Sequence, residues 1–175
     1  MRRDLILPPL RRTSADAEAF ACAVHADQID KAGDPYVDHL WRVAARTTAK
    51  ASGLPGYLND MMVSEMLQIA WLHDVIEDTP YRQQDLFREG FSTEVVFGVL
   101  ALTKHTGVRY DEAIRDLCQD APLAVLLVKL SDNEDNADLD RLAQLDAGTQ
   151  ARLLAKYEPS MAMLNEAVRA KGWRG

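Results

Sequence analysis

HDVIEDT, the sequence of residues 73–79, stands where a long segment of apolar residues at helical spacing ends. If the helix continues through it, His73 and Glu77 share one face, because residues four apart lie one turn above each other. Asp74 and Asp78 have the same spacing and lie on the neighbouring stripe. One imidazole and three carboxylates within two turns are costly unless a cation or a proton pathway satisfies them. The stretch therefore indicates a metal site, since imidazole plus carboxylate suits zinc, manganese or iron.

Helical periodicity extends over most of the chain, and no segment shows sustained alternation of apolar and polar residues, so we expect an all-α protein. Thr13 precedes Asp16 by three residues, which is typical of a capping box at the start of a helix. Pro159 interrupts the last apolar segment and should kink or split that helix. The expected helices span 15–29, 38–50, 59–73, 85–88, 92–103, 110–118, a segment that starts at 122, and 150–171.

The composition of the 175 residues predicts a single domain over residues 1–175, with an irregular arm at 1–12. No apolar run approaches the roughly 20 residues that span a membrane, and the apolar part of the arm is too short for a signal peptide. Cys22 and Cys118 lie far apart, so we expect reduced core residues of a cytoplasmic protein. The net charge of −7 argues against general nucleic-acid binding but permits a small anionic substrate beside a bound cation.

A metal site needs three or four protein ligands, and one helix end rarely supplies them all. His39 opens the second expected helix, and Asp132 ends the leucine-rich helix that starts at 122. Together with His73 and Asp74 they offer two imidazoles and two carboxylates. Such a set leaves coordination positions for water and substrate, as a catalytic metal site requires.

Five segments occur in an order that points to one family. They are Ala19-Phe20-Ala21 with His25 and Gln28, Gly33–His39 with Val43-Ala44, Leu72–Thr79, Leu102-Thr103-Lys104, and Val128–Asp132 with Asn136. In this order they resemble the HD superfamily of metal-dependent phosphohydrolases. More narrowly, the chain resembles the hydrolase domain of RelA/SpoT-type alarmone enzymes and their small free-standing relatives. The likeness spans about residues 14–165, so the five motifs together predict an HD-domain helical bundle.

The resemblance implies roles for the site residues. The metal ligands would be His39, His73, Asp74 and Asp132, with manganese as the ion and zinc, iron or magnesium as alternatives. Glu77 and Asp78 would position or deprotonate the attacking water. Family members hydrolyse the 3′-pyrophosphate of ppGpp and release GDP and pyrophosphate, so the expected partner is a small nucleotide.

The same resemblance implies substrate contacts. Asn136 would lie near the ribose, and Lys31 and Thr103 belong to matching motifs. Lys104, Arg109 and Lys129 are candidates to hold phosphate oxygens, although basic residues near helix ends often serve only to offset the helix dipole.

Three segments depart from the family pattern. Asp30 and Lys31 stand where the family usually carries adjacent basic residues, one of which packs on the guanine base, and the acidic side chain of Asp30 repels phosphate. Leu40 replaces the usual proline after the first ligand, and Asn133-Glu134-Asp135 replaces a more basic or apolar run. We interpret the acidic residues of this region as a solvated face, namely Glu134, Asp135, Asp138 and Asp140.

Three functions follow from these observations. The first is a small alarmone hydrolase, which Glu77-Asp78-Thr79 and Thr103-Lys104 favour. The second is another HD phosphohydrolase, acting on a nucleoside monophosphate or on a different base. The third is a degenerate domain that binds a nucleotide without turnover. A homo-oligomer is also open, because Met161, Met163 and Leu164 fit a dimer interface and a core equally well.

Overall fold

The computed structural model describes residues 11–54, 60–104 and 106–175, so nearly all of the predicted arm at 1–12 lies outside the described residues. The helices are α1 (Ser14–Val24), α2 (Tyr36–Lys50), the 3₁₀ turn η1 (Ala51–Gly53), α3 (Asp60–Leu72), α4 (Val75–Asp78), α5 (Gln83–Arg88), α6 (Thr93–Leu102), α7 (Tyr110–Asp120), α8 (Leu123–Asn136), α9 (Leu139–Leu142) and α10 (Ala147–Ala170). Within these ranges the extended pairing is a single bridge between Ile29 and Pro35, which confirms the all-α prediction.

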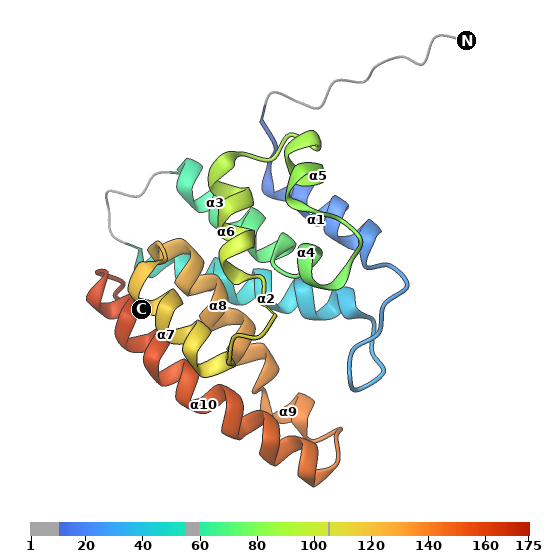
Figure 1. Cartoon of the computed structure of the whole chain (residues 1–175), viewed down its shortest axis with the longest axis vertical. Coiled ribbons are helices and arrows are strands. Elements are labelled where there is room, and N and C mark those ends of the chain that lie inside the picture. Colours follow the sequence, from blue (N-terminus) through green and yellow to red (C-terminus); the bar gives the residue numbers. More distant parts are fainter. Residues whose placement is uncertain (1–10, 55–59, 105) are drawn as a thin grey trace.

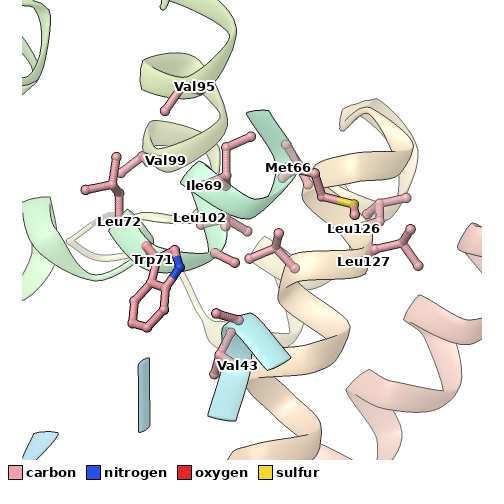
Figure 2. Close-up of a cluster of buried hydrophobic side chains, with 14 of the residues drawn as sticks. Val43, Met66, Ile69, Trp71, Leu72, Val95, Val99, Leu102, Leu126 and Leu127 are labelled. Carbon is pink, nitrogen blue, oxygen red and sulfur yellow. The ribbon is translucent and has the colours of Figure 1, made fainter. Parts of the chain in front are cut away.

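Two helices, α3 and α8, form the centre of the bundle (Figure 1). α3 contacts α1, α2, α6 and α8, while α8 also contacts α2, α6 and α10. Figure 2 shows how side chains of α2, α3, α6 and α8 meet in one apolar cluster. The sequence of α8 explains its position, because Val125–Val128 are four consecutive buried residues and a helix that is apolar all round must be covered on every side.

The start of α1 agrees with the sequence, but its end does not. Thr13 and Asp16 form the predicted capping box, in which the Asp16 amide donates to Thr13 Oγ1 at 3.2 Å. The helix was expected to reach residue 29, yet it ends at Val24 with His25 as its C-cap. The backbone then turns, and Ile29 pairs with Pro35, so residues 25–29 belong to a loop instead of continuing the helix.

The HDVIEDT sequence does not lie on one continuous helix, which corrects the expected sharing of faces by His73 with Glu77 and by Asp74 with Asp78. α3 ends at Leu72, and α4 starts at Val75, with Asp74 at its N-cap position. His73 and Asp74 therefore occupy the junction between two helices instead of two stripes of one helix. Asn59, the expected first residue of this segment, lies outside the described residues.

The last helix continues through Pro159 as one element, so the expected split does not occur. Burial of Tyr157, Ser160 and Leu164 on either side of the proline holds both parts against the bundle. Leu164 belongs to the core, and the partly buried Met161 and Met163 pack against it. Cys22 and Cys118 are free thiols that are partly buried against the same core.

No described helix combines the length and the apolar character needed to cross a lipid bilayer.

Candidate metal centre and substrate cavity

The structure brings the four predicted ligands together from three parts of the chain. His39 lies on α2, His73 and Asp74 lie at the junction of α3 and α4, and Asp132 lies near the end of α8. The Nε2 atom of His39 is 3.7 Å from Asp74 Oδ2 and 3.5 Å from Asp132 Oδ1. The Nε2 atom of His73 is 3.0 Å and 3.8 Å from the same two oxygens. The ligand atoms of His39, His73 and Asp74 lie within 4.8 Å of one another, so this group can hold a divalent metal ion.

Hydrogen bonds on the far side of each imidazole direct its Nε2 atom toward this centre. Nδ1 of His39 lies 2.7 Å from Asp135 Oδ2, and Nδ1 of His73 lies 2.8 Å from the carbonyl oxygen of Ala70. Both acceptors lack a proton, so both Nδ1 atoms carry one, and each Nε2 atom can offer its lone pair to a metal ion once it has lost its own proton. His73 Nε2 is buried and has no hydrogen-bond partner among the described residues. A buried nitrogen of this kind, 3.0 Å and 3.8 Å from two carboxylate oxygens, fits a metal ion.

The electrostatic environment also fits a cation. Asp132 and Asp135 lie in the last two turns of α8, where the helix dipole disfavours negative charge. Asp132 Oδ2 accepts a hydrogen bond from Lys129 Nζ at 2.8 Å, and Asp132 Oδ1 accepts one from Asn136 Nδ2 at 2.6 Å. Burial opposes ionisation of Asp132, but the ammonium of Lys129 and the imidazole of His73 lower its pKa overall. The carboxylate therefore stays charged in a buried position.

The protonation of the other ligands follows from the same contacts. Burial works to lower the pKa of His73, but the carboxylates of Asp74 and Asp132 outweigh it and raise that pKa to about 9. Burial works to raise the pKa of Asp74, but His73, His39 and a hydrogen bond from Tyr36 lower it. In the metal-free protein, a proton on His73 thus takes the place that a cation would fill.

A cavity of about 1170 Å³ opens beside the four ligands, with His39, Asp74 and Asp132 in its wall. Glu77 and Asp78 from α4 line the same cavity. Glu77 Oε2 accepts the backbone amide of Lys104 at 2.9 Å, and Asp78 Oδ2 accepts Tyr36 Oη at 3.2 Å. Partial burial and the carboxylates of Asp74 and Glu77 raise the pKa of Asp78. Two carboxylates therefore stand next to the candidate metal centre, one of them with increased basicity.

Most of the predicted substrate contacts lie in the wall of this cavity, and one does not. Lys31, Thr103, Lys104 and Asn136 all line it, as does Lys129. Arg109 is not part of the wall. Its side chain is 79% exposed and donates to Asp111 at 3.0 Å, so the structure does not bring it to the cavity.

Sequence reasoning missed two basic residues of the cavity wall, Arg141 and Lys156. Lys156 of α10 lies in the wall, with its Nζ atom 4.2 Å from the ring centroid of Tyr110 and 4.6 Å from that of Tyr157. No carboxylate lies within salt-bridge distance of Lys156 in the described part of the chain. Burial and the nearby charge of Lys129 lower the pKa of Lys156. The residue was hidden because a lysine in an amphipathic helix has no local signal that distinguishes a cavity from solvent.

The acidic residues after Asp132 do not form the expected solvated face. Asp135 is fully buried and binds His39, Arg42 and Arg141. Glu134 forms an ion pair with Lys50. Asp138 forms an ion pair with Arg46 and also caps the N-terminus of α9. Of the four, Asp140 alone is exposed. The interpretation was wrong because the partners of these carboxylates come from distant parts of the chain.

Comparisons with known proteins agree with this fold. No protein-family model matches the chain. A GTP pyrophosphokinase of Myxococcus xanthus is 30% identical over 152 residues, which cover 78% of this chain and 18% of that protein. A guanosine-3′,5′-bis(diphosphate) 3′-pyrophosphohydrolase of Haemophilus influenzae is 32% identical over 120 residues, which cover 64% and 16%. The chain thus spans less than a fifth of the length of these curated relatives.

A solved structure matches most of the chain. It is a metazoan orthologue of SpoT described as hydrolysing ppGpp, with a TM-score of 0.61 and 22% sequence identity. The match covers 91% of this chain and 95% of the other. The chain therefore has the helical fold of this SpoT-like hydrolase, and the resemblance to RelA/SpoT-type hydrolases predicted from its five motifs is confirmed.

Proposed function

We propose that the protein is a metal-dependent hydrolase that removes the 3′-pyrophosphate of ppGpp or of a closely related nucleotide. The observation that carries this proposal is that the pair His73-Asp74 borders one cavity through Asp74, and that the pair Glu77-Asp78 lines the same cavity. The first pair belongs to the candidate metal centre, and the second supplies carboxylates next to it. The Haemophilus influenzae relative, a guanosine-3′,5′-bis(diphosphate) 3′-pyrophosphohydrolase, supports the choice of this nucleotide as substrate.

His39, His73, Asp74 and Asp132 would hold a divalent ion, and manganese suits this mixture of imidazole and carboxylate. Such an ion supplies Lewis-acid chemistry toward water and phosphate oxygens. Asp78, whose pKa is raised, or Glu77 would accept the proton of the attacking water. Attack at phosphorus would break the ester bond to the 3′ oxygen, so that GDP and pyrophosphate leave.

The remaining cavity wall would hold the nucleotide. Lys31, Lys104 and Lys156 would bind phosphate oxygens. Ile29 lines the mouth of the cavity with 71% of its surface exposed, which offers an apolar face to a planar base. Asn136 already donates to Asp132, so it would orient this ligand as well as approach the ribose.

Incubation of the purified protein with Mn²⁺ and a panel of 3′- and 5′-phosphorylated nucleosides tests the proposal. We expect pyrophosphate and GDP from ppGpp, and no product with the Asp74→Ala variant. Release of orthophosphate from a nucleoside monophosphate would replace the proposal with another HD phosphohydrolase activity. Binding without any product would indicate a domain that senses a nucleotide.

A further inference from the structure

Two acidic residues that depart from the RelA/SpoT pattern meet on one arginine. Arg141 of α9 donates from Nη2 to Asp30 Oδ2 and from Nη1 to Asp135 Oδ2, each at 2.6 Å. Asp30 and Asp135 are 105 positions apart in the numbering of the chain, one in the loop after α1 and the other in α8. Neither carboxylate therefore faces the cavity as a free negative charge, and both departures belong to one network.

One end of this network reaches a candidate metal ligand. Asp135 Oδ2 also lies 2.7 Å from Nδ1 of His39, and Asp135 is fully buried. Arg42 donates to the other oxygen, Oδ1, at 2.8 Å. With both oxygens bound, the carboxylate has a fixed orientation, and it fixes in turn the ring and the tautomer of His39. Outer partners of this kind orient metal-binding histidines and strengthen their basicity.

The other end reaches the loop that carries Lys31. Asp30 Oδ1 accepts the backbone amides of Ala32 and Asp34 at 2.8 Å and 3.1 Å, and so holds the turn together. Its second oxygen, Oδ2, is the one that Arg141 binds. The position of the Lys31 loop against the cavity thus depends on the same guanidinium that holds the partner of His39.

We propose that Asp135 is a positioning residue for His39, and that Arg141 couples the metal centre to the loop at residues 29–35. An ion bound through His39 would fix the ring, and the ring would fix Asp135 and Arg141 in the arrangement that also holds Asp30. Metal and nucleotide would then each favour the geometry that the other requires. The inference rests on the proposed function for the identity of the site. It adds how the metal centre and the loop at residues 29–35 are positioned relative to each other.

Titration of the metal-free protein with Mn²⁺ in a calorimeter tests the positioning role. For Asp135→Asn we expect an affinity about 10- to 100-fold weaker, as for other outer partners of metal ligands. The matched control is Glu134→Gln, which removes the adjacent carboxylate on α8 and should leave the affinity unchanged. An unchanged affinity in Asp135→Asn would overturn the positioning role.

Hydrogen–deuterium exchange followed by mass spectrometry tests the coupling. In the wild-type protein, Mn²⁺ should slow exchange at the amides of Ala32 and Asp34 by about fivefold or more. In Arg141→Met the loop should exchange at the same rate with and without Mn²⁺. The capping box at Thr13–Asp16 serves as an internal reference, because it lies outside the network. Equal slowing of the loop in Arg141→Met and wild type would overturn the coupling.

A second variant tests the inference if Asp135→Asn is not folded. If Asp135→Asn does not fold by circular dichroism, Arg141→Lys replaces it, because a single ammonium cannot hold two carboxylates in the fork geometry of a guanidinium. Arg141→Lys should then weaken Mn²⁺ binding and remove the Mn²⁺ effect on the loop. A protein that shows these dependences but hydrolyses no nucleotide would end the proposed function and leave this inference intact.

Discussion

The Nε2 atom of His73 lies 3.0 Å from Oδ2 of Asp74, although the two residues are consecutive in the chain. On a continuous helix, consecutive side chains diverge by about 100°, so such neighbours point to different faces. The break between α3 and α4 removes this divergence and lets both side chains reach the same centre. The interruption of the helix is therefore the local feature that makes a two-ligand motif out of adjacent residues.

Replacement of Asp74 by Ala should abolish both metal retention and turnover. The change removes a carboxylate oxygen that lies within 4 Å of both imidazoles. We expect Mn²⁺ affinity to fall more than about 100-fold, the upper end of the loss caused by an outer partner. Elemental analysis of the purified variant and calorimetric titration measure the effect. Full activity of this variant after treatment with a chelator would refute the assignment of the site.

Binding of Mn²⁺ should release a proton at neutral pH. Asp74 and Asp132 raise the pKa of His73 to about 9 in the metal-free protein, and a protonated imidazole cannot bind a metal. Affinity should therefore increase by about tenfold per pH unit between pH 7 and 9 if one proton leaves. Calorimetry in two buffers of different ionisation enthalpy counts the proton. An affinity that does not change over this range would contradict the prediction.

The raised pKa of His73 also makes the stability of the metal-free protein depend on pH. The pKa of His73 is higher in the folded state than the ordinary value of 6.5. Its protonation therefore contributes stability fully below pH 6.5, and this contribution disappears as the pH increases through about 9. Urea unfolding of the metal-free protein at pH 6 and pH 9 should show the loss, and a saturating concentration of Mn²⁺ should reduce it.

Replacement of Glu77 by Gln should slow turnover without loss of metal. Glutamine keeps an oxygen that can accept the Lys104 amide, so the backbone contact survives while the carboxylate charge is removed. General-base contributions are typically 10²- to 10⁴-fold, and we expect kcat to fall within that range. Glu94→Gln on the exposed face of α6 is the control. Undiminished kcat in Glu77→Gln would transfer the proton-acceptor role to Asp78 alone.

Sequence reasoning located the ligands better than it located their surroundings. His39, His73, Asp74 and Asp132 were found because rare residue types occur at helix ends in a characteristic order. The end of α3 at Leu72 lies one residue before the expected end, but the separate helix α4 was not predicted, because four residues are too few to show a helical period. Asp135 was misinterpreted because its partners, His39 and Arg141, are distant in sequence or lie on α9, a helix too short to recognise.

The sequence does not distinguish basic residues that line the cavity from those that point to solvent. Arg109 and Lys156 look equivalent in sequence, but Lys156 lines the cavity while Arg109 points to solvent and binds Asp111. Lys156→Met should raise KM for the nucleotide by about tenfold or more, the value of a charge-assisted hydrogen bond, with little change in kcat.

Arg109→Met is the matched control, because it removes a cation of the same charge and should leave KM unchanged. Methionine keeps an unbranched chain that can pack on Tyr110 and Tyr157, so the effect isolates the ammonium. Steady-state kinetics with Mn²⁺ and ppGpp provide the measurement. Equal KM values for the two variants would mean that the phosphates lie elsewhere in the cavity, whereas a change confined to Lys156→Met would place them against α10.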